Sequence, residues 1–250
     1  ATMPRPNAPP PPLDVARDAL FLDYDGTLCG FTLDIMAATI DPAVANTLQR
    51  LAAALDGALG VITGRPLKDL DALAAPLKTA ATGQHGHEVR LRPNAEPHYP
   101  IAAPKGFAEL ERELRAFEAA HSGVVVEAKG RNYCVHYRRN PAAAEAAGRL
   151  CDRLAARCDP PAGRMDGHLM TEITIPGAHK GVGLRILLKD AAFAGRRPVF
   201  FGDDISDEDG FRAATDLGGH GVLVGDRDSA AVYRVADVDA VHAWLRAAAA

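Results

Sequence analysis

The clearest candidates for a chemical role in this chain are acidic residues that follow two apolar segments. Asp23 and Asp25 come directly after the apolar residues 19–22, and an acid-rich segment at 203–209 follows the apolar residues 198–201. Each apolar run has the composition of a buried strand. Ligands of open α/β sheets bind outside the carboxyl ends of strands, so we expect the two acidic segments to meet there. Crowded carboxylates repel one another unless a hard cation lies among them, and oxygen ligands suit Mg²⁺.

Two further segments supply the other groups that phosphate chemistry needs. In residues 61–65, an apolar run ends at Thr63, which carries a hydroxyl group. Lys180 is a lone cation before a predicted helix. A single D-x-D pair is a weak signal because acidic pairs are common on solvated loops, whereas four signals in this order are specific. Together they resemble the signatures of the haloacid-dehalogenase superfamily of phosphotransferases, whose D-x-D-G-T-L motif is matched by residues 23–28.

This resemblance implies a role for each residue. Asp23 would attack phosphorus and become an aspartyl phosphate, a known use of carboxylate nucleophiles. Asp25 would donate a proton to the leaving oxygen and then accept one from the attacking water. Thr63 and neighbouring backbone N–H groups would hold phosphoryl oxygens at a helix N-terminus, and Lys180 would neutralise their charge. The implied catalytic set is Asp23, Asp25, Thr63 and Lys180, with Gly64 and Arg65 as phosphate-binding residues.

Magnesium is the cofactor that these residues imply. Asp23, the backbone carbonyl of Asp25 and Asp203 would be its protein ligands. Oxygen ligands of this kind leave coordination positions for water and for a substrate phosphate. The expected metal site therefore draws on both acidic segments.

The remaining acids of the second segment are expected to play supporting roles. Asp204 and Asp207 would orient bound water and Lys180 from outside the ligand shell. Glu208 and Asp209 are expected only to complement the dipole of a helix that begins there.

Length and composition bound the class of protein. The 250 residues carry a net charge of −4, with 48% hydrophobic and 24% charged residues. These values are ordinary for a globular protein and give no electrostatic footprint for nucleic acid or an anionic membrane. No apolar run could span a bilayer, no secretory leader pattern is present, and the four cysteines lack C-x-x-C spacing. We therefore expect a reduced, cytoplasmic monomer that acts on a small-molecule sugar phosphate, as the resemblances imply.

Apolar strands and helical patterns alternate through most of the chain. Asp41 and Pro42 have the residue types of a helix N-cap and first turn, before leucines with helical spacing at 48–55. Apolar runs that predict strands lie at residues 19–22, 58–62, 80–82, 198–201 and 222–224. This alternation favours a parallel sheet covered by helices.

The pattern changes between residues 104 and 176. Helix–hairpin–helix–hairpin is predicted there, with Asp166 and Gly167 as the turn of the second hairpin. Residues 1–12 are rich in proline and predict a disordered or polyproline-type tail. The predicted fold is α/β: a Rossmann-like haloacid-dehalogenase core, a parallel sheet with helices on both faces, at 13–103 and 177–250, with an inserted α+β cap at 104–176.

One face of the predicted insert sheet is polar. Strand alternation separates an apolar face from one that gathers charged side chains. A solvated face is the commoner explanation for such a pattern, and a surface that binds sugar hydroxyls is the alternative. The polar residues are Glu127, Lys129, His136, Arg138 and Glu172.

Within the superfamily, the chain resembles the trehalose-6-phosphate phosphatase family. Residues 202–211 match its G-D-D-x-[ST]-D-E-D-x-F motif, and residues 83–88 match G-x-H-G-x-E loosely. An E-x-K hairpin followed by H-Y-R is matched at 127–129 and 136–138, and Glu172 precedes Lys180 as in the family. The resemblance implies that a disaccharide contacts Glu127, Lys129, Arg138 and Glu172, with His136 and the loop 85–88 as further contacts.

The activity implied by this resemblance is Mg²⁺-dependent hydrolysis of trehalose 6-phosphate. A related sugar phosphatase that acts on sucrose 6-phosphate or mannosyl-phosphoglycerate is one alternative. A non-catalytic sugar-phosphate-binding regulator is another, but a binding module has no use for a nucleophile such as Asp23.

Overall fold

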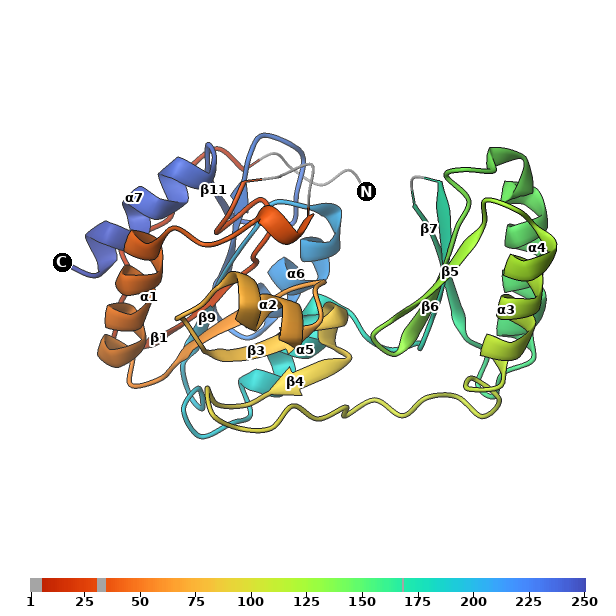
Figure 1. Ribbon diagram of the computed structural model, residues 1–250. Coiled ribbons are helices and arrows are strands. Elements are labelled where there is room, and N and C mark those ends of the chain that lie inside the picture. Colours follow the sequence, from red (N-terminus) through yellow and green to blue (C-terminus); the bar gives the residue numbers. More distant parts are fainter. Residues whose placement is uncertain (1–5, 31–34, 168) are drawn as a thin grey trace. The chain divides into compact units, whose positions relative to one another are not determined.

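The protein, described as a computed structural model over residues 6–30, 35–167 and 169–250, divides into two compact units. The core unit extends to Pro100 and resumes from Ala178 to Ala250, and the insert unit is Ile101–Gly177 (Figure 1). The first boundary thus lies a few residues before position 104, where the sequence pattern changes.

The core unit is built on a sheet with strand order β11-β10-β9-β1-β2-β3-β4. Neighbouring strands run parallel, except for the antiparallel pair β3 and β4. Central strand β1 is buried at every position and pairs with β9 through Leu22 and Phe201. The strands are β1 (Asp18–Leu22), β2 (Leu59–Ile62), β3 (Ala80–Gly83), β4 (Glu88–Arg90), β9 (Arg197–Gly202), β10 (His220–Val224) and β11 (Tyr233–Val235).

Helices cover this sheet. Helices α5 and α6 pack against each other and against the strands, and α1 packs against α7. Asp41 caps α1 as the sequence predicts, since its carboxylate accepts the N–H of Ala43 at 2.7 Å. The core helices are α1 (Pro42–Ala54), α2 (Leu67–Leu73), α5 (Lys180–Leu187), α6 (Glu208–Asp216) and α7 (Val238–Ala248). The prediction of a parallel sheet flanked by helices is confirmed.

The insert unit is an antiparallel sheet of order β5-β6-β8-β7 with two helices on one face. Val126, Val135 and Ile173 bury the helix-facing side. Strand alternation leaves the other side for polar residues. The elements are α3 (Leu110–Ala120), β5 (Val125–Lys129), β6 (Asn132–His136), α4 (Ala144–Ala156), β7 (Gly163–Gly167) and β8 (Met170–Thr174).

The second hairpin of the insert is present, but its turn was predicted too early. Asp166 and Gly167 belong to β7, where they pair with Thr171 and Met170. The Asp166 carboxylate accepts the Thr171 hydroxyl at 3.0 Å, and this cross-strand bond fixes the register. The connection follows Gly167 and includes Leu169, whose φ is 57°.

Residues 6–12 contact the core unit through two of their backbone carbonyls. The Ala8 carbonyl accepts the N–H of Arg234 on edge strand β11 at 2.9 Å. The Pro11 carbonyl accepts Trp244 Nε1 at 3.3 Å. An edge strand leaves backbone groups unpaired, and the Ala8 carbonyl pairs with one of them. Residues 1–5 lie outside the described part of the chain.

Strands β4 and β11 were also not predicted. Each has three residues, too few to show a hydrophobic period. Within the described residues, no helix combines the length and apolarity needed to cross a membrane.

Candidate active site

Asp23 lies where the sequence places it, directly after β1. Its backbone N–H donates to the Phe201 carbonyl at 2.9 Å, so the ends of β1 and β9 are joined. Lys180, the first residue of α5, places Nζ 2.9 Å from Asp23 Oδ1 and 2.7 Å from Asp207 Oδ1. All three side chains are at most 5% exposed. Three segments distant in sequence therefore form one buried cluster.

Asp207 holds both the lysine and the acidic loop. Its Oδ2 accepts the backbone N–H groups of Asp203 and Asp204, each at 3.0 Å. Its Oδ1 accepts Lys180 Nζ. Asp207 thus orients Lys180, in the supporting position that the sequence suggested.

Two other acids of this segment differ from expectation. Asp204 begins the short helical turn Ile205–Asp207 through its backbone, whose N–H donates to Asp207 Oδ2 and whose carbonyl accepts the Asp207 N–H, each at 3.0 Å. It makes no bond to Lys180 in the described structure. Glu208 is 5% exposed and accepts hydrogen bonds from Ser229 and Ala230. It is a buried anchor rather than a solvated acid at a helix start, because the loop after β10 folds over it.

Burial and crowding act together on the acids of the cluster. Burial raises the pKa of Asp23 well above its usual value, against the lowering effect of Lys180. Burial, reinforced by Asp207, raises the pKa of Asp203 to about 6. Burial alone would lower the pKa of Lys180, but Asp23 and Asp207 outweigh it and raise that pKa. The single positive charge of Lys180 does not balance three carboxylates. An additional divalent cation would complete the balance.

The donor atoms fit such a cation. Asp23, Asp203 and Asp207 offer carboxylate oxygens within 4.8 Å of one another. Asp207 already uses both oxygens for Lys180 and the loop N–H groups. Asp203 Oδ1 is buried without a hydrogen-bond partner among the described residues. Hard oxygen donors of this kind suit Mg²⁺. Asp23 and Asp203 are therefore the side chains available to hold it.

The carboxylate of Asp25 is paired with the guanidinium of Arg65. Arg65 Nε and Nη2 each donate to one oxygen of Asp25, both at 2.6 Å. This hydrogen-bonded fork raises the pKa of Arg65. The contact of Arg65 with phosphate stays a prediction, and in this structure its guanidinium holds Asp25. A residue type that can pair with phosphate or carboxylate does not reveal its partner from sequence.

Thr63, Gly64 and Arg65 form a rigid loop after β2. Thr63 is fully buried, and its hydroxyl accepts the Arg65 N–H at 3.1 Å. The N–H groups of Gln84 and His85 donate to the carbonyls of Arg65 and Thr63 at 2.9 and 3.1 Å. A Cβ at Gly64 would lie 2.6 Å from the His85 ring, so a larger residue there would require that ring to move. The segment that contains Gln84 and His85 therefore fixes the conformation of the loop at residues 63–65.

Two supporting contacts were not predicted from the sequence. Glu88, expected in a loop that contacts the sugar, accepts the N–H of Leu67 at 2.8 Å and so caps α2. In the insert, Asn132 Nδ2 donates to Glu172 Oε1 and Asn132 Oδ1 accepts the Ile175 N–H, each at 3.0 Å. Nothing in its local sequence distinguishes Asn132 from a turn residue.

The polar face of the insert forms a paired network. Glu127 and Glu172 flank Cys134 in one row of the sheet. His136 Nε2 lies 2.8 Å from Glu127 Oε2, and Lys129 Nζ lies 3.5 Å from Glu172 Oε2. Glu172 is only 2% exposed. This face therefore holds its charges in place, unlike a fully solvated one.

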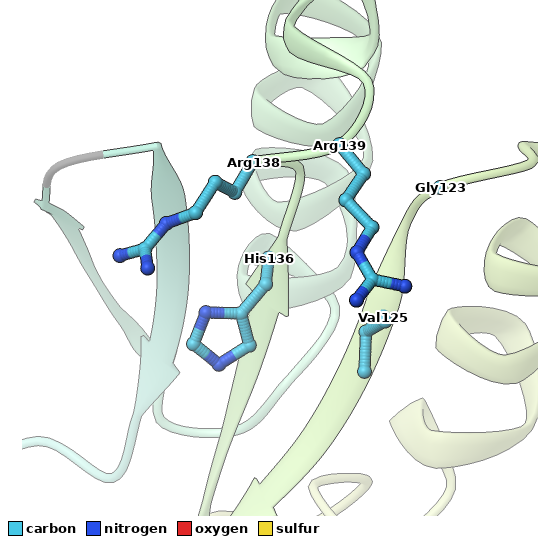
Figure 2. A pocket seen from close by; sticks show the side chains of 5 residues that line it. All are labelled: Gly123, Val125, His136, Arg138 and Arg139. Carbon is cyan, nitrogen blue, oxygen red and sulfur yellow. The ribbon is translucent and has the colours of Figure 1, made fainter. Parts of the chain in front are cut away.

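Arg138 lies just after β6 and is exposed. With His136 and Arg139 it lines a hollow of about 390 Å³. Figure 2 shows Arg139 extending toward Val125 while Arg138 extends to the other side of His136. Arg139 was not singled out from the sequence, although it directly follows the H-Y-R segment. Arg138 and Arg139 therefore place positive charge at the edge of the polar face.

Sequence comparison connects both sets of residues to one family. The chain matches the profile of the trehalose-phosphatase family over residues 21–239. It is 36% identical over 231 residues to the trehalose-6-phosphate phosphatase of Escherichia coli strain K12. That match covers 92% of this chain and 86% of the relative.

Comparison with solved structures shows the same fold. Aspergillus fumigatus trehalose-6-phosphate phosphatase, crystal form 3, superposes with a TM-score of 0.69 at 24% identity, covering 97% of this chain and 99% of that chain. A phosphatase of the haloalkanoate (HAD) enzyme superfamily from Bacteroides thetaiotaomicron gives 0.60 at 18% identity, covering 91% and 92%.

Proposed function

Because the chain belongs to the trehalose-phosphatase family and is a phosphatase, we propose that it hydrolyses trehalose 6-phosphate to trehalose and phosphate with Mg²⁺ as its cofactor. The observation that carries this proposal is the buried cluster in which Lys180 bridges Asp23 and Asp207 beside Asp203. A buried carboxylate paired with one cation and open to a second suits nucleophilic attack on a phosphate.

In the proposed mechanism, Asp23 attacks phosphorus and the bond from phosphorus to the sugar oxygen breaks. Asp25 gives its proton to that oxygen, and trehalose leaves. Asp25, now a carboxylate, takes a proton from the water that attacks the aspartyl phosphate and frees Asp23. Arg65 would orient the Asp25 carboxyl group through its two hydrogen bonds.

Lys180 and the loop after β2 would hold the charge of the phosphoryl group. Lys180 is fixed by Asp207, so its ammonium group need not reorganise during the reaction. Magnesium, held by Asp23 and Asp203, would supply Lewis-acid stabilisation of the phosphoryl oxygens. In the loop after β2, the Gly64 N–H would supply a donor, because the N–H groups of Thr63 and Arg65 already bind the Thr82 carbonyl and the Thr63 hydroxyl.

We further propose that the polar face of the insert recognises the disaccharide. The core groups address phosphate and metal, which every phosphomonoester shares. Sugar hydroxyls need paired donors and acceptors held in fixed positions, and the Lys129, Glu127 and Glu172 network supplies them. Arg138 would add a donor at the edge of this face.

Metal removal tests the catalytic part of this proposal. A chelator should abolish phosphate release from trehalose 6-phosphate, and excess Mg²⁺ should restore it. Ca²⁺ should not replace Mg²⁺, because its larger and more flexible shell allows both oxygens of Asp23 to coordinate and misaligns the attack. Full turnover in excess chelator would contradict the proposed cofactor.

A further inference from the structure

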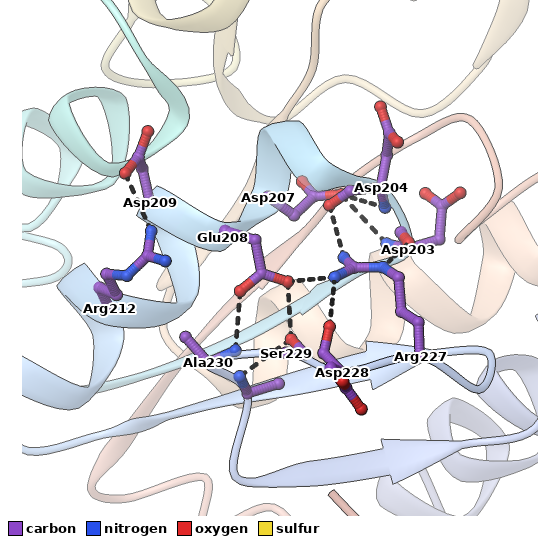
Figure 3. A network of polar contacts seen from close by, with 11 residues as sticks. Asp203, Asp204, Asp207, Glu208, Asp209, Arg212, Arg227, Asp228, Ser229 and Ala230 are labelled. Carbon is purple, nitrogen blue, oxygen red and sulfur yellow. Dashed lines mark hydrogen bonds and ion pairs between the residues drawn. The ribbon is translucent and has the colours of Figure 1, made fainter. Parts of the chain in front are cut away.

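The acidic loop that follows β9 is held by an arginine that the proposed mechanism does not use. Arg227 lies in the loop between β10 and β11. Its Nε donates to the Asp203 carbonyl at 3.1 Å, and its Nη2 donates to the Asp204 carbonyl at 2.7 Å (Figure 3). One planar guanidinium therefore fixes two successive peptide groups of the loop.

Arg227 is itself anchored by Glu208. Its Nη1 donates to Glu208 Oε1, and the same carboxylate accepts Ser229 Oγ and the Ala230 N–H, both at 2.7 Å. Figure 3 shows these contacts converging on Glu208 at the start of α6. The Arg227 side chain is 28% exposed and that of Glu208 is 6% exposed. A buried carboxylate without its cation is costly, so the two side chains depend on each other.

The loop is thus held from both sides. Asp207 accepts the N–H groups of Asp203 and Asp204, while Arg227 binds their carbonyls. The Asp203 carboxylate lies directly against Gly26, since a Cβ built there would lie 2.2 Å from Asp203 Oδ2. A small rotation of the loop would therefore change where this carboxylate points.

We propose that Arg227, anchored by Glu208, is a positioning residue for the cation-binding carboxylate of Asp203. The inference rests on the proposed Mg²⁺ site. Residues that orient metal ligands contribute to metal affinity without touching the metal. Arg227 and Glu208 would act in this way through the backbone of residues 203–204.

The test measures Mg²⁺ binding directly, by isothermal titration calorimetry without substrate and by the Mg²⁺-dependent rise in Tm. Arg227→Gln removes the guanidinium fork and should weaken Mg²⁺ binding by about 10- to 100-fold. Arg227→Lys keeps a charge for Glu208 but lacks the fork, so its affinity should fall between those of Arg227→Gln and the wild type. The KM for sugar phosphate at saturating Mg²⁺ should change much less.

Arg234→Gln is the matched control. Arg234 pairs with Asp226 in the same region of the chain but has no contact with residues 203–204 in the described structure. Its loss should leave Mg²⁺ affinity within about twofold of the wild type, as for other exposed substitutions.

Each result decides between a positioning role and a merely structural one. Arg227→Gln with lowered Tm but wild-type Mg²⁺ affinity would overturn the inference. If that variant does not fold, Arg227→Lys decides in the same way. A wild-type protein that binds no Mg²⁺ would contradict the proposed metal site together with its positioning pair, whereas intact wild-type binding with unchanged variants would contradict the pair alone.

Discussion

Lys180 would allow the buried Asp23 to act as the proposed nucleophile. Burial favours the protonated form of Asp23, which cannot attack phosphorus. Lys180 opposes this effect from 2.9 Å, and its own charge is stabilised by Asp207 on the opposite side. The proposed Mg²⁺ would complete the compensation. Catalytic competence therefore depends on a balance of charges shared by several residues.

Asp23→Asn tests the nucleophile. The amide keeps the shape of the side chain but removes the charge that attacks phosphorus, so turnover should fall by about a thousandfold or more while the fold persists. Phosphate release and circular dichroism measure the two properties. Asp216→Asn is the matched control, because its exposed pair with Arg185 lies outside the cluster. Activity of Asp23→Asn within tenfold of wild type would falsify covalent catalysis by Asp23.

Arg65→Gln distinguishes two roles of this arginine. If Arg65 mainly orients Asp25, as the two 2.6 Å hydrogen bonds indicate, its loss should lower kcat at least about tenfold with little change in KM. If it mainly binds phosphate, KM should rise and inhibition by inorganic phosphate should weaken. Steady-state kinetics with phosphate as an inhibitor gives all three quantities, and we expect the kcat effect to dominate.

At the scale of elements, the sequence predicts those strands and helices whose position depends on hydrophobic periodicity and on local capping residues. The buried strand before Asp23 and the α1 cap at Asp41 are both readable from residue types. The two short edge strands and the position of the second hairpin turn are not, because pairing with distant segments determines them. The hydrogen bond from Arg234 of β11 to Ala8 is a tertiary contact that the local sequence of the proline-rich segment does not indicate.

The same division applies to the site. Asp23, Lys180 and Asp203 could be placed because each adjoins a strand or helix end. The partners of Arg65 and Glu208 could not, since each lies across a loop whose course is not encoded locally. Sequence therefore predicts which groups reach the sheet edge better than it predicts how they pair.

The insert sheet should determine substrate choice. Replacing Glu127, Lys129 or Glu172 by Ala removes a charged hydrogen bond to a sugar hydroxyl, a loss of about 1.5–3 kcal/mol, or roughly ten- to a hundredfold in kcat/KM for trehalose 6-phosphate. p-Nitrophenyl phosphate has no sugar hydroxyls, so its hydrolysis should be nearly unaffected.

The small substrate also serves as the control for these variants. Equal losses on both substrates would assign the residues to folding or core geometry. No loss on either would mean that the polar face is an ordinary solvated one, despite the burial of Glu172.

At the scale of the whole molecule, the two units carry different chemical groups. The core unit gathers the proposed nucleophile Asp23, Lys180 and the acids that suit a cation. The insert unit gathers paired acids and bases without a nucleophile among them. Such a division allows one phosphoryl-transfer site to serve a particular sugar phosphate through contacts that the core does not provide.

The central claim is most directly tested by kcat/KM for phosphate release from a panel of sugar phosphates at saturating Mg²⁺. The panel compares trehalose 6-phosphate with sucrose 6-phosphate, mannosyl-phosphoglycerate and p-nitrophenyl phosphate. We predict that trehalose 6-phosphate is preferred over each of the others by at least about a hundredfold, the value of one or two well-placed hydrogen bonds to the sugar. Equal or higher kcat/KM for another sugar phosphate would contradict the proposed substrate, and no release from any of them would contradict the proposed hydrolysis.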